Sequence, residues 1–281
     1  MTGFSGGSDG ADPAGRVIVA PSGVLYGTTA YGNGTGCSHG VGCGVVFKLT
    51  PPSTICRSVS CPWVETTLYG FTGSSDGGKP VGDLALDQSG NIYGTTFEGG
   101  NGYGVVYELS PSGGGWRETI LYAPRSDGDG AVPEDGVTID HAGNLYGVFA
   151  DNGPNGFGAV YELSRSGSGW AEQTVYGFVS EQDGSTPTGG LILDSAGNLY
   201  GTAHNGPGGD GIVYELSPSD HGWQFNTLYA FRGSMMAVTQ PRNLSWIVLE
   251  ICTAQPKRAE RVGLERSSSC HHRTVGGWRQ S

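Results

Sequence analysis

The chain has 281 residues, 52 of them glycine, and a formal net charge of −11 at pH 7. A chain of this acidity is not expected to bind nucleic acid, whose phosphates attract basic surfaces. It contains no apolar run long enough to cross a bilayer, so no membrane span is expected.

One short motif recurs four times and carries most of the structural information in the sequence. It reads GVLYGTT, GNIYGTT, GNLYGVF and GNLYGTA, and each copy is followed by a glycine-rich gap and an apolar run such as VVYEL. The tryptophans keep the same period, with intervals of 53, 54 and 53 residues between Trp63, Trp116, Trp170 and Trp223. A fixed period of this size indicates that one supersecondary unit is copied along the chain.

Each period is predicted to contain four short β-strands, here called a to d, and no helix. In the fourth copy these are residues 190–194, 198–203, 211–217 and 223–231, separated by turn residues. The a–b turn, DSAGN, suits a tight hairpin because Asp194 can bond the following backbone and Gly197 tolerates a left-handed conformation. Four strands in about 53 residues predict an all-β, β-propeller-type array.

In chain order, the predicted blades of the propeller domain 1–231 cover about residues 4–70, 71–123, 124–177 and 178–231. Because the pattern stops after the fourth copy, we expect an incomplete ring with exposed apolar blade faces and a tendency to self-associate. The opening residues, MTGFSGGSDG, already read as part of a repeat. Any export signal is therefore expected upstream of them.

The first blade carries two seven-residue insertions, expected to be exposed, and each brings two cysteines. Cys37 and Cys43 lie in the b–c loop, and Cys56 and Cys61 lie in the c–d loop. These loops are at opposite ends of strand c, about 23 Å apart, so the predicted disulfides are Cys37 with Cys43 and Cys56 with Cys61. The alternatives are a zinc site, which the spacing disfavours, and free thiols. Disulfides would place the protein in an oxidising compartment, extracellular or at the cell surface.

The C-terminal residues 232–281 depart from the repeat. The segment from Phe231 to Ser281 contains 8 basic and 3 acidic residues, and all 13 tyrosines lie earlier in the chain. Binding of this tail to nucleic acid or anionic lipid is one interpretation. We favour a change of reading frame or a truncation, because the arginines show no helical face or aromatic interleaving. Residues 244–251, LSWIVLEI, could add an imperfect strand, and the remaining tail is expected to be disordered.

The best copy of the unit reads SDGGKPVGDLALDQSGNIYGTTFEGGNGYGVVYELSPSGGGWRETILYA, residues 75–123. This unit resembles the GloVer tandem repeat of choice-of-anchor bacterial surface proteins, and the resemblance covers residues 4–231. It implies an exported, propeller-like array, often held to the envelope by a separate C-terminal anchor. It implies no reaction.

The d–a and b–c loops are expected to meet on one face of the propeller, forming an acidic, glycine-rich rim. The residues proposed to bind a ligand there are Asp76, Asp127, Asp183, Glu98, Asp151 and His204. No cofactor is expected apart from calcium, which carboxylates and loop carbonyls suit, so a cation or polyol site is one interpretation. The other interpretation is that the Asp-Gly pairs are only turn residues.

Signatures of catalysis are sparse, and no catalytic residue is assigned. The six histidines occupy no equivalent blade positions, and none lies in a Ser/His/Asp motif. The glycine-rich EGGNGYGVV leads into a strand, which argues against a phosphate loop. The recurring Trp and Tyr of strand d suit core packing better than sugar stacking. Two carboxylates with a histidine or arginine at the central channel would favour an enzyme.

From these features we predict an exported or cell-surface protein that acts as a non-catalytic binding or scaffold module. Its expected ligand is a carbohydrate or an envelope component. The alternative from a different class is a carbohydrate-active propeller enzyme, a hydrolase or lyase, and a third interpretation is a structural spacer. Glycan binding with and without calcium would distinguish them.

Overall fold

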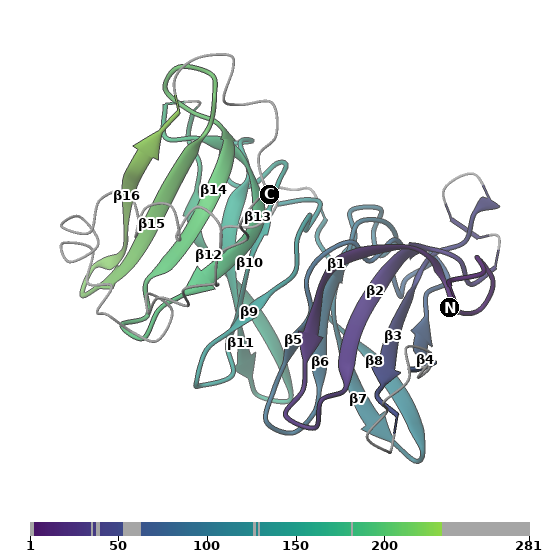
Figure 1. Cartoon of the computed structure of the whole chain (residues 1–281). Helices are drawn as coiled ribbons and strands as arrows, with labels where there is room; N and C mark the ends of the chain where they lie inside the picture. Colours follow the sequence, from purple (N-terminus) through teal and green to yellow (C-terminus); the bar gives the residue numbers. More distant parts are fainter. Residues whose placement is uncertain are drawn as a thin grey trace, which may run out of the picture. The chain divides into compact units, whose positions relative to one another are not determined.

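A computed structural model shows four antiparallel four-stranded sheets, which confirms the predicted all-β propeller architecture (Figure 1). It describes residues 3–34, 36–37, 40–52, 63–125, 128, 130–180 and 182–231. The tail 232–281 lies outside the described residues. No helix in the described ranges has the length and apolar character needed to cross a membrane.

Each sheet pairs its strands in chain order, and we number the sheets as blades 1 to 4. Blade 1 contains β1 (Ala11–Val19), β2 (Leu25–Tyr31), β3 (Val45–Thr50) and β4 (Val64–Gly70). Blade 2 contains β5 (Ala85–Leu86), β6 (Ile92–Thr96), β7 (Val105–Ser112) and β8 (Gly115–Tyr122). Blade 3 contains β9 (Thr138–Ile139), β10 (Leu145–Phe149), β11 (Ala159–Ser166) and β12 (Gly169–Gly177). Blade 4 contains β13 (Ser185–Leu193), β14 (Leu199–Asn205), β15 (Ile212–Ser219) and β16 (Gly222–Ala230).

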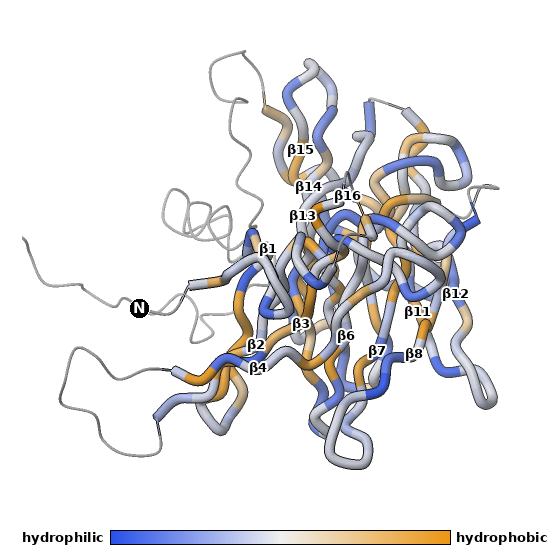
Figure 2. The backbone as a smooth tube through the Cα atoms, turned by 90° about the vertical axis from the view of Figure 1, so that its right-hand side faces the viewer, coloured by the Kyte–Doolittle hydropathy of each residue, from blue (hydrophilic) through white to orange (hydrophobic). Residues whose placement is uncertain are grey.

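The second strand of each inner blade, β6 in blade 2 and β10 in blade 3, is buried on both faces, because a neighbouring blade packs on each side. All five residues of β6 are buried, as are all five of β10. The fourth strands β8 and β12 instead alternate between exposed and partly buried positions over most of their length. Figure 2 shows this distribution as apolar colouring along the strands and polar colouring in many of the loops.

The predicted a–b turn is closed by its aspartate, which explains the DxxGNxY part of the repeat. Oδ1 of Asp87 accepts the backbone N–H groups of Ser89 and Asn91, both at 2.8 Å. Its Oδ2 accepts the side-chain amide of Asn91 at 2.8 Å and the hydroxyl of Tyr93 at 3.2 Å. The same network recurs at Asp140 and Asp194. These three carboxylates therefore stabilise hairpins.

Successive blades are joined by one recurring aromatic contact. The tryptophan of each later blade packs edge to face on the tyrosine of the preceding YG motif, with ring centroids 6.4, 6.3 and 6.1 Å apart in the three interfaces. The pairs are Tyr26–Trp116, Tyr93–Trp170 and Tyr146–Trp223. This agrees with the prediction that the recurring tryptophan serves core packing.

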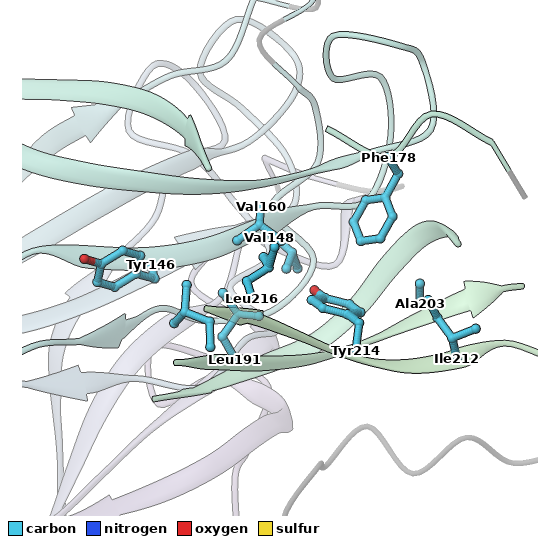
Figure 3. Close-up of a cluster of buried hydrophobic side chains, with 10 residues drawn as sticks. Tyr146, Val148, Val160, Phe178, Leu191, Ala203, Ile212, Tyr214 and Leu216 are labelled. Atoms are coloured by element: carbon cyan, nitrogen blue, oxygen red, sulfur yellow. The ribbon is translucent and has the colours of Figure 1, made fainter. Parts of the chain in front are cut away.

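The interface between blades 3 and 4 shows how the rest of the core is built. Val148 and Val160 of blade 3 face Leu191 and Leu216 of blade 4 in one buried cluster (Figure 3). Phe178, which follows β12, packs on Tyr214 of β15 with centroids 5.4 Å apart. Phe71 packs on Tyr107 in the same way between blades 1 and 2, at 5.1 Å.

The interface between blades 2 and 3 fills the same space with a different residue. Pro124 stands where the other interfaces have Phe71 and Phe178. Phe149 stands where they have Thr96 and Ala203, and its ring stacks on Tyr161 at 4.2 Å. The aromatic group is therefore supplied by strand b of the later blade instead of the end of the earlier one.

Three buried clusters join blades 1 to 2, 2 to 3 and 3 to 4. Among the described residues, no such cluster joins blade 4 back to blade 1.

Candidate functional site

The d–a loop carboxylates of the proposed rim are hydrogen-bonded within their own loops. Asp76 accepts the backbone N–H and the hydroxyl of Thr72, at 2.9 and 2.5 Å, and the hydroxyl of Tyr69 at 3.1 Å. Asp183 accepts the hydroxyl of Tyr176 at 2.6 Å and the backbone N–H of Ser180 at 2.9 Å. Both carboxylates thus tie a loop to the end of the preceding strand. Asp127, the third of this set, lies outside the described residues.

The b–c loop residues of the rim are placed by backbone pairing. Glu98 exchanges two backbone hydrogen bonds with Gly78, at 2.8 and 2.9 Å. Asp151 is paired in the same way with Ala131, and its side chain is exposed. His204 is also exposed but lies one residue before the equivalent position, which Asn205 occupies opposite Ser185.

Within the described ranges, no three His, Cys, Asp or Glu side chains come close enough to hold a metal ion. The structure therefore places Glu98 and Asp151 on b–c loops but His204 within β14, which corrects its predicted loop position. The three residues are not joined into a cation site in the described ranges. The ligand-binding role of the rim stays a prediction.

A second polar group, which sequence reasoning did not identify, lies at the first strands of the blades, the strands nearest the axis of a propeller. Asp83 accepts the backbone N–H of Arg16 and forms an ion pair with its Nε, both at 2.5 Å. Asp135 accepts the backbone N–H groups of Gly136 and Asp83, at 2.8 and 3.2 Å. Arg16, Asp83 and Asp135 thus link three successive blades. We call them the axial cluster.

A cavity of about 240 Å³ adjoins the axial cluster. Arg16 and Asp83 line it together with residues 84–86, 136–139 and 190–191, so all four blades contribute. Its walls include the aliphatic side chains of Leu84, Val137 and Leu191. The cavity is smaller than the clefts that usually hold drug-sized ligands.

Burial raises the pKa of Asp135, and the neighbouring carboxylate of Asp83 raises it further. The backbone N–H groups around Asp135 oppose this rise. A carboxyl with a raised pKa beside a second carboxylate and an arginine matches the channel cluster that would favour an enzyme. In this cluster, however, each carboxylate already accepts hydrogen bonds from neighbouring strands.

The repeat itself explains why the axial cluster was missed. The positions equivalent to Arg16 are Asp83, Gly136 and Gly190, so blades 1 and 2 carry charged residues where blades 3 and 4 have glycine. Recurrence identifies what the blade architecture requires, and it says nothing about a position that differs between copies. The signal in the sequence was a departure from the repeat: charged residues stand at a position where the other blades have glycine.

Another acidic group is shared between blades 1 and 2. Burial raises the pKa of Glu118 on β8 to about 7, and the nearby Asp76 contributes to the rise. Oε1 of Glu118 is buried and has no hydrogen-bond partner among the described residues. In blade 4 the equivalent residue is Phe225, whose ring stacks on Tyr176 at 4.4 Å. Blades 1 and 3 also have glutamate at the equivalent position, Glu65 and Glu172, and an aromatic ring packs there only in blade 4.

The predicted disulfide between Cys37 and Cys43 is present, with Cα atoms 4.8 Å apart. The two cysteines are buried, 7% and 1% exposed, so the expectation of an exposed insertion is wrong for them. Their sulfurs occupy the space next to Gly73 and Gly78, where a Cβ at either glycine would collide with Cys37. The disulfide is therefore part of the interface between blades 1 and 2. Cys56 and Cys61 lie outside the described residues.

Residues 37–245 match the family model of the Gloeobacter/Verrucomicrobia repeat. No curated protein matches the chain. Similar solved structures include a protein of unknown function from Dyadobacter fermentans, 14% identical, with a TM-score of 0.44 over 80% of this chain and 70% of that chain. AofleA from Arthrobotrys oligospora is 12% identical, with a TM-score of 0.44 over 80% of this chain and 59% of its own.

An α-L-arabinofuranosidase from Clostridium thermocellum is 13% identical, with a TM-score of 0.42 over 82% of this chain and 75% of its own. At these identities and scores, none of the three solved structures supports a particular function for this chain.

Proposed function

Because the chain belongs to the Gloeobacter/Verrucomicrobia repeat family and folds as a propeller of four blades, we propose that it is a non-catalytic binding or scaffold module outside the cell. Its proposed ligand is a polysaccharide or another envelope component. The observation that carries this proposal is the use of the acidic side chains: Asp76, Asp83 and Asp135 all accept hydrogen bonds that hold loops or blades together.

Catalytic carboxylates in sugar hydrolysis need one group free to give a proton and another free to attack or to activate water. The ion pair with Arg16 holds Asp83 against β1, and the two backbone N–H groups hold Asp135 between blades 2 and 3. These contacts favour a structural role for the axial cluster. The binding role is then assigned to the exposed rim, where Asp151 and His204 face solvent.

The Cys37–Cys43 disulfide supports the proposed location, because disulfides persist in oxidising compartments outside the cytosol. Its burial between blades 1 and 2 supports a structural rather than a regulatory bond, since buried sulfurs exchange slowly with thiols.

A glycan array with the full chain, in calcium and in a chelator, tests the proposal. We expect binding to a polysaccharide class that weakens in the pair of substitutions Asp151→Asn and His204→Ala. Asp220→Asn is the matched control, because Asp220 is exposed in the c–d turn of blade 4, outside the b–c loops. Loss of binding in the chelator would show that binding requires calcium. Equal loss in the control would count against the rim as the binding surface.

The second candidate is a carbohydrate-active enzyme, and the axial cluster is the observation that favours it. In that case Asp135, with its raised pKa, would act as the general acid, and Asp83 would be the second carboxylate. Release of reducing ends from a polysaccharide by the wild type, abolished by Asp135→Asn, would support the enzyme over the binding module.

A further inference from the structure

One residue near the start of each blade has a left-handed backbone although it is not glycine. These residues are Asp12, Lys79, Val132 and Thr186, with φ between 51° and 56°. Each precedes a proline, which favours an extended backbone in the residue before it. Glycine adopts a left-handed conformation without steric cost, but none of the four blades has glycine here. Strain of this kind is typical of functional sites, so the side chain at this position is a candidate for ligand contact.

Contacts between blades 1 and 2 hold Lys79 in this conformation. Its backbone N–H donates to the carbonyl of Cys43 at 2.7 Å, and its own carbonyl accepts the N–H of Phe97 at 3.1 Å. The following residue, Pro80, packs so closely on Gly44 that a Cβ at the glycine would lie 2.7 Å from the proline Cδ. The backbone of Lys79 is therefore fixed from both blades, and its side chain starts from a defined position.

The side chain of Lys79 lies near two aromatic rings. Its Nζ is 4.7 Å from the ring centroid of Phe97 in blade 2 and 6.0 Å from that of Tyr31 in blade 1. All three side chains are partly exposed. Within the described part of the chain, the Nζ has neither an ion pair nor a hydrogen bond. The ring faces attract the ammonium but leave its N–H donors for another acceptor. We call Tyr31, Lys79 and Phe97 the lysine site.

The lysine site is a place where the blades differ from one another. In the other blades, the position of Tyr31 is occupied by Glu98, Asp151 and Asn205, and that of Phe97 by Ala30, Ala150 and His204. Blade 1 also has a b–c insertion that the other blades lack, and its disulfide-bonded Cys43 supports Lys79 from below. The blade architecture does not require these features, since the other blades form without them. Their convergence on one junction favours a ligand site over packing.

We propose that the lysine site binds the carboxylate of a uronate unit in an acidic polysaccharide. The ammonium of Lys79 would donate charge-assisted hydrogen bonds to the carboxylate. The rings of Tyr31 and Phe97 would pack on the apolar C–H face of the sugar. This inference rests on the proposed binding function, which assigns a polysaccharide to the same loops, and it adds the chemical class of the ligand. Because the surrounding rim is acidic, long-range attraction does not favour a polyanion, and binding depends on these short-range contacts.

Titration calorimetry of the full chain tests the proposal, with oligosaccharides of polygalacturonate, alginate and hyaluronate, each in calcium and in a chelator. We expect at least one of them to bind. Methyl esterification of its carboxylates keeps the sugar chain but removes the charge, and is expected to weaken binding about tenfold or more, as for the loss of a hydrogen bond between charged groups. Dextran sulfate, an anion without carboxylates, should bind more weakly.

Lys79→Met, which keeps the length of the side chain, should weaken binding about tenfold, whereas Lys79→Arg should retain it. Lys79→Gly removes the same ammonium in a residue that suits the left-handed backbone, so it replaces Lys79→Met if that variant fails to fold. Phe97→Ala should also weaken binding. Lys48→Met is the matched control, because Lys48 is the other lysine of the described residues and lies on β3, outside the b–c loops.

The outcomes separate this proposal from the proposed function. Binding that Lys79→Met and Lys79→Gly leave unchanged, equal binding of the esterified oligosaccharide, or equal binding of dextran sulfate overturns the uronate site. So does a wild type that binds only neutral polysaccharides, and in each of these cases the general binding function stands. A wild type that binds no glycan overturns both.

Discussion

The ring of Tyr107 occupies the space that a side chain at Gly94 would need. The two residues are paired across β6 and β7, and a Cβ at position 94 would lie 2.5 Å from the tyrosine hydroxyl. The same pairing joins Gly147 to Tyr161 and Gly201 to Tyr214. The YG motif of the repeat is thus one half of a contact whose other half lies on strand c. This contact explains why the glycine recurs in every copy.

The hydroxyl of Tyr107 is buried without a partner among the described residues, so Tyr107→Phe is expected to stabilise the protein. Removing an unpaired buried hydroxyl should raise the free energy of unfolding by about 1 kcal/mol. Blade 1 already has Phe47 at this position. The reverse change, Phe47→Tyr, should therefore destabilise. Urea denaturation of both variants measures the effect, and a loss of stability in Tyr107→Phe would show that the hydroxyl is bonded.

Pro124 and Phe149 are expected to be energetically coupled, because Phe149 fills the space that Phe71 and Phe178 fill in the other interfaces. Phe149→Thr alone should cost about 3 kcal/mol by leaving a cavity. Pro124→Phe alone should cost about 1 to 3 kcal/mol by overpacking. The double variant restores the arrangement of blades 1 and 2 and should approach wild-type stability. A double-mutant cycle with additive costs would contradict this interpretation.

Features that recur in each copy could be predicted from the sequence. The a–b turn at Asp194 and Gly197 depends on local chemistry, and the tryptophans recur every 53 or 54 residues, so the turn and the packing role of the tryptophans could be predicted. The tyrosine that Trp116 contacts, Tyr26, could not. The hydrogen bond from Tyr69 to Asp76 was missed although it recurs at Tyr176 and Asp183, seven residues apart in each case. That recurrence was a usable signal.

The axial cluster could not be predicted in the same way. Arg16, Asp83 and Asp135 are brought together by the packing of three blades, and their positions differ in residue type from copy to copy. A contact between residues about 50 to 70 positions apart, with no counterpart in the other blades, depends on how the blades are placed around the axis. Single-blade patterns do not contain that information.

The stability of the protein is expected to fall as pH rises from about 4.5 to 7. The pKa of Glu118 is raised to about 7 by burial and by Asp76, so the folded chain binds more protons than the unfolded chain in this range. Since stability decreases with pH wherever the folded state binds more protons, the loss continues as pH rises through the folded pKa of about 7. The titratable groups that face Glu118 are Asp76, Tyr69 and Tyr107.

Glu118→Gln should reduce this fall and raise the thermal midpoint at pH 8, with little change near pH 4.5. The matched control is Asp220→Asn, an exposed acidic residue in the β15–β16 turn, which should leave the pH profile unchanged. Thermal denaturation of the three proteins across this range is the measurement. A profile for Glu118→Gln that parallels the wild type would assign the pH dependence to other groups.

Removal of the Cys37–Cys43 disulfide is expected to destabilise the protein by about 2 kcal/mol, as for a short closed loop. The buried position of both sulfurs adds a packing loss in the variant Cys37→Ala/Cys43→Ala. Chemical denaturation compares this variant with the wild type. Non-reducing digestion of the oxidised wild type should also yield Cys56 linked to Cys61, the pair that stays a prediction. An unchanged denaturation midpoint would exclude a stabilising role for the observed bond.

One experiment tests the proposed non-catalytic function most directly. The full chain is incubated with the polysaccharide that it binds best on the glycan array, and both the bound polymer and the released reducing ends are measured. The account predicts that the polymer binds and keeps its length, and that Asp83→Asn and Asp135→Asn variants that remain folded bind as well as the wild type. Release of reducing ends that disappears in Asp135→Asn would contradict it and assign the axial cluster to catalysis.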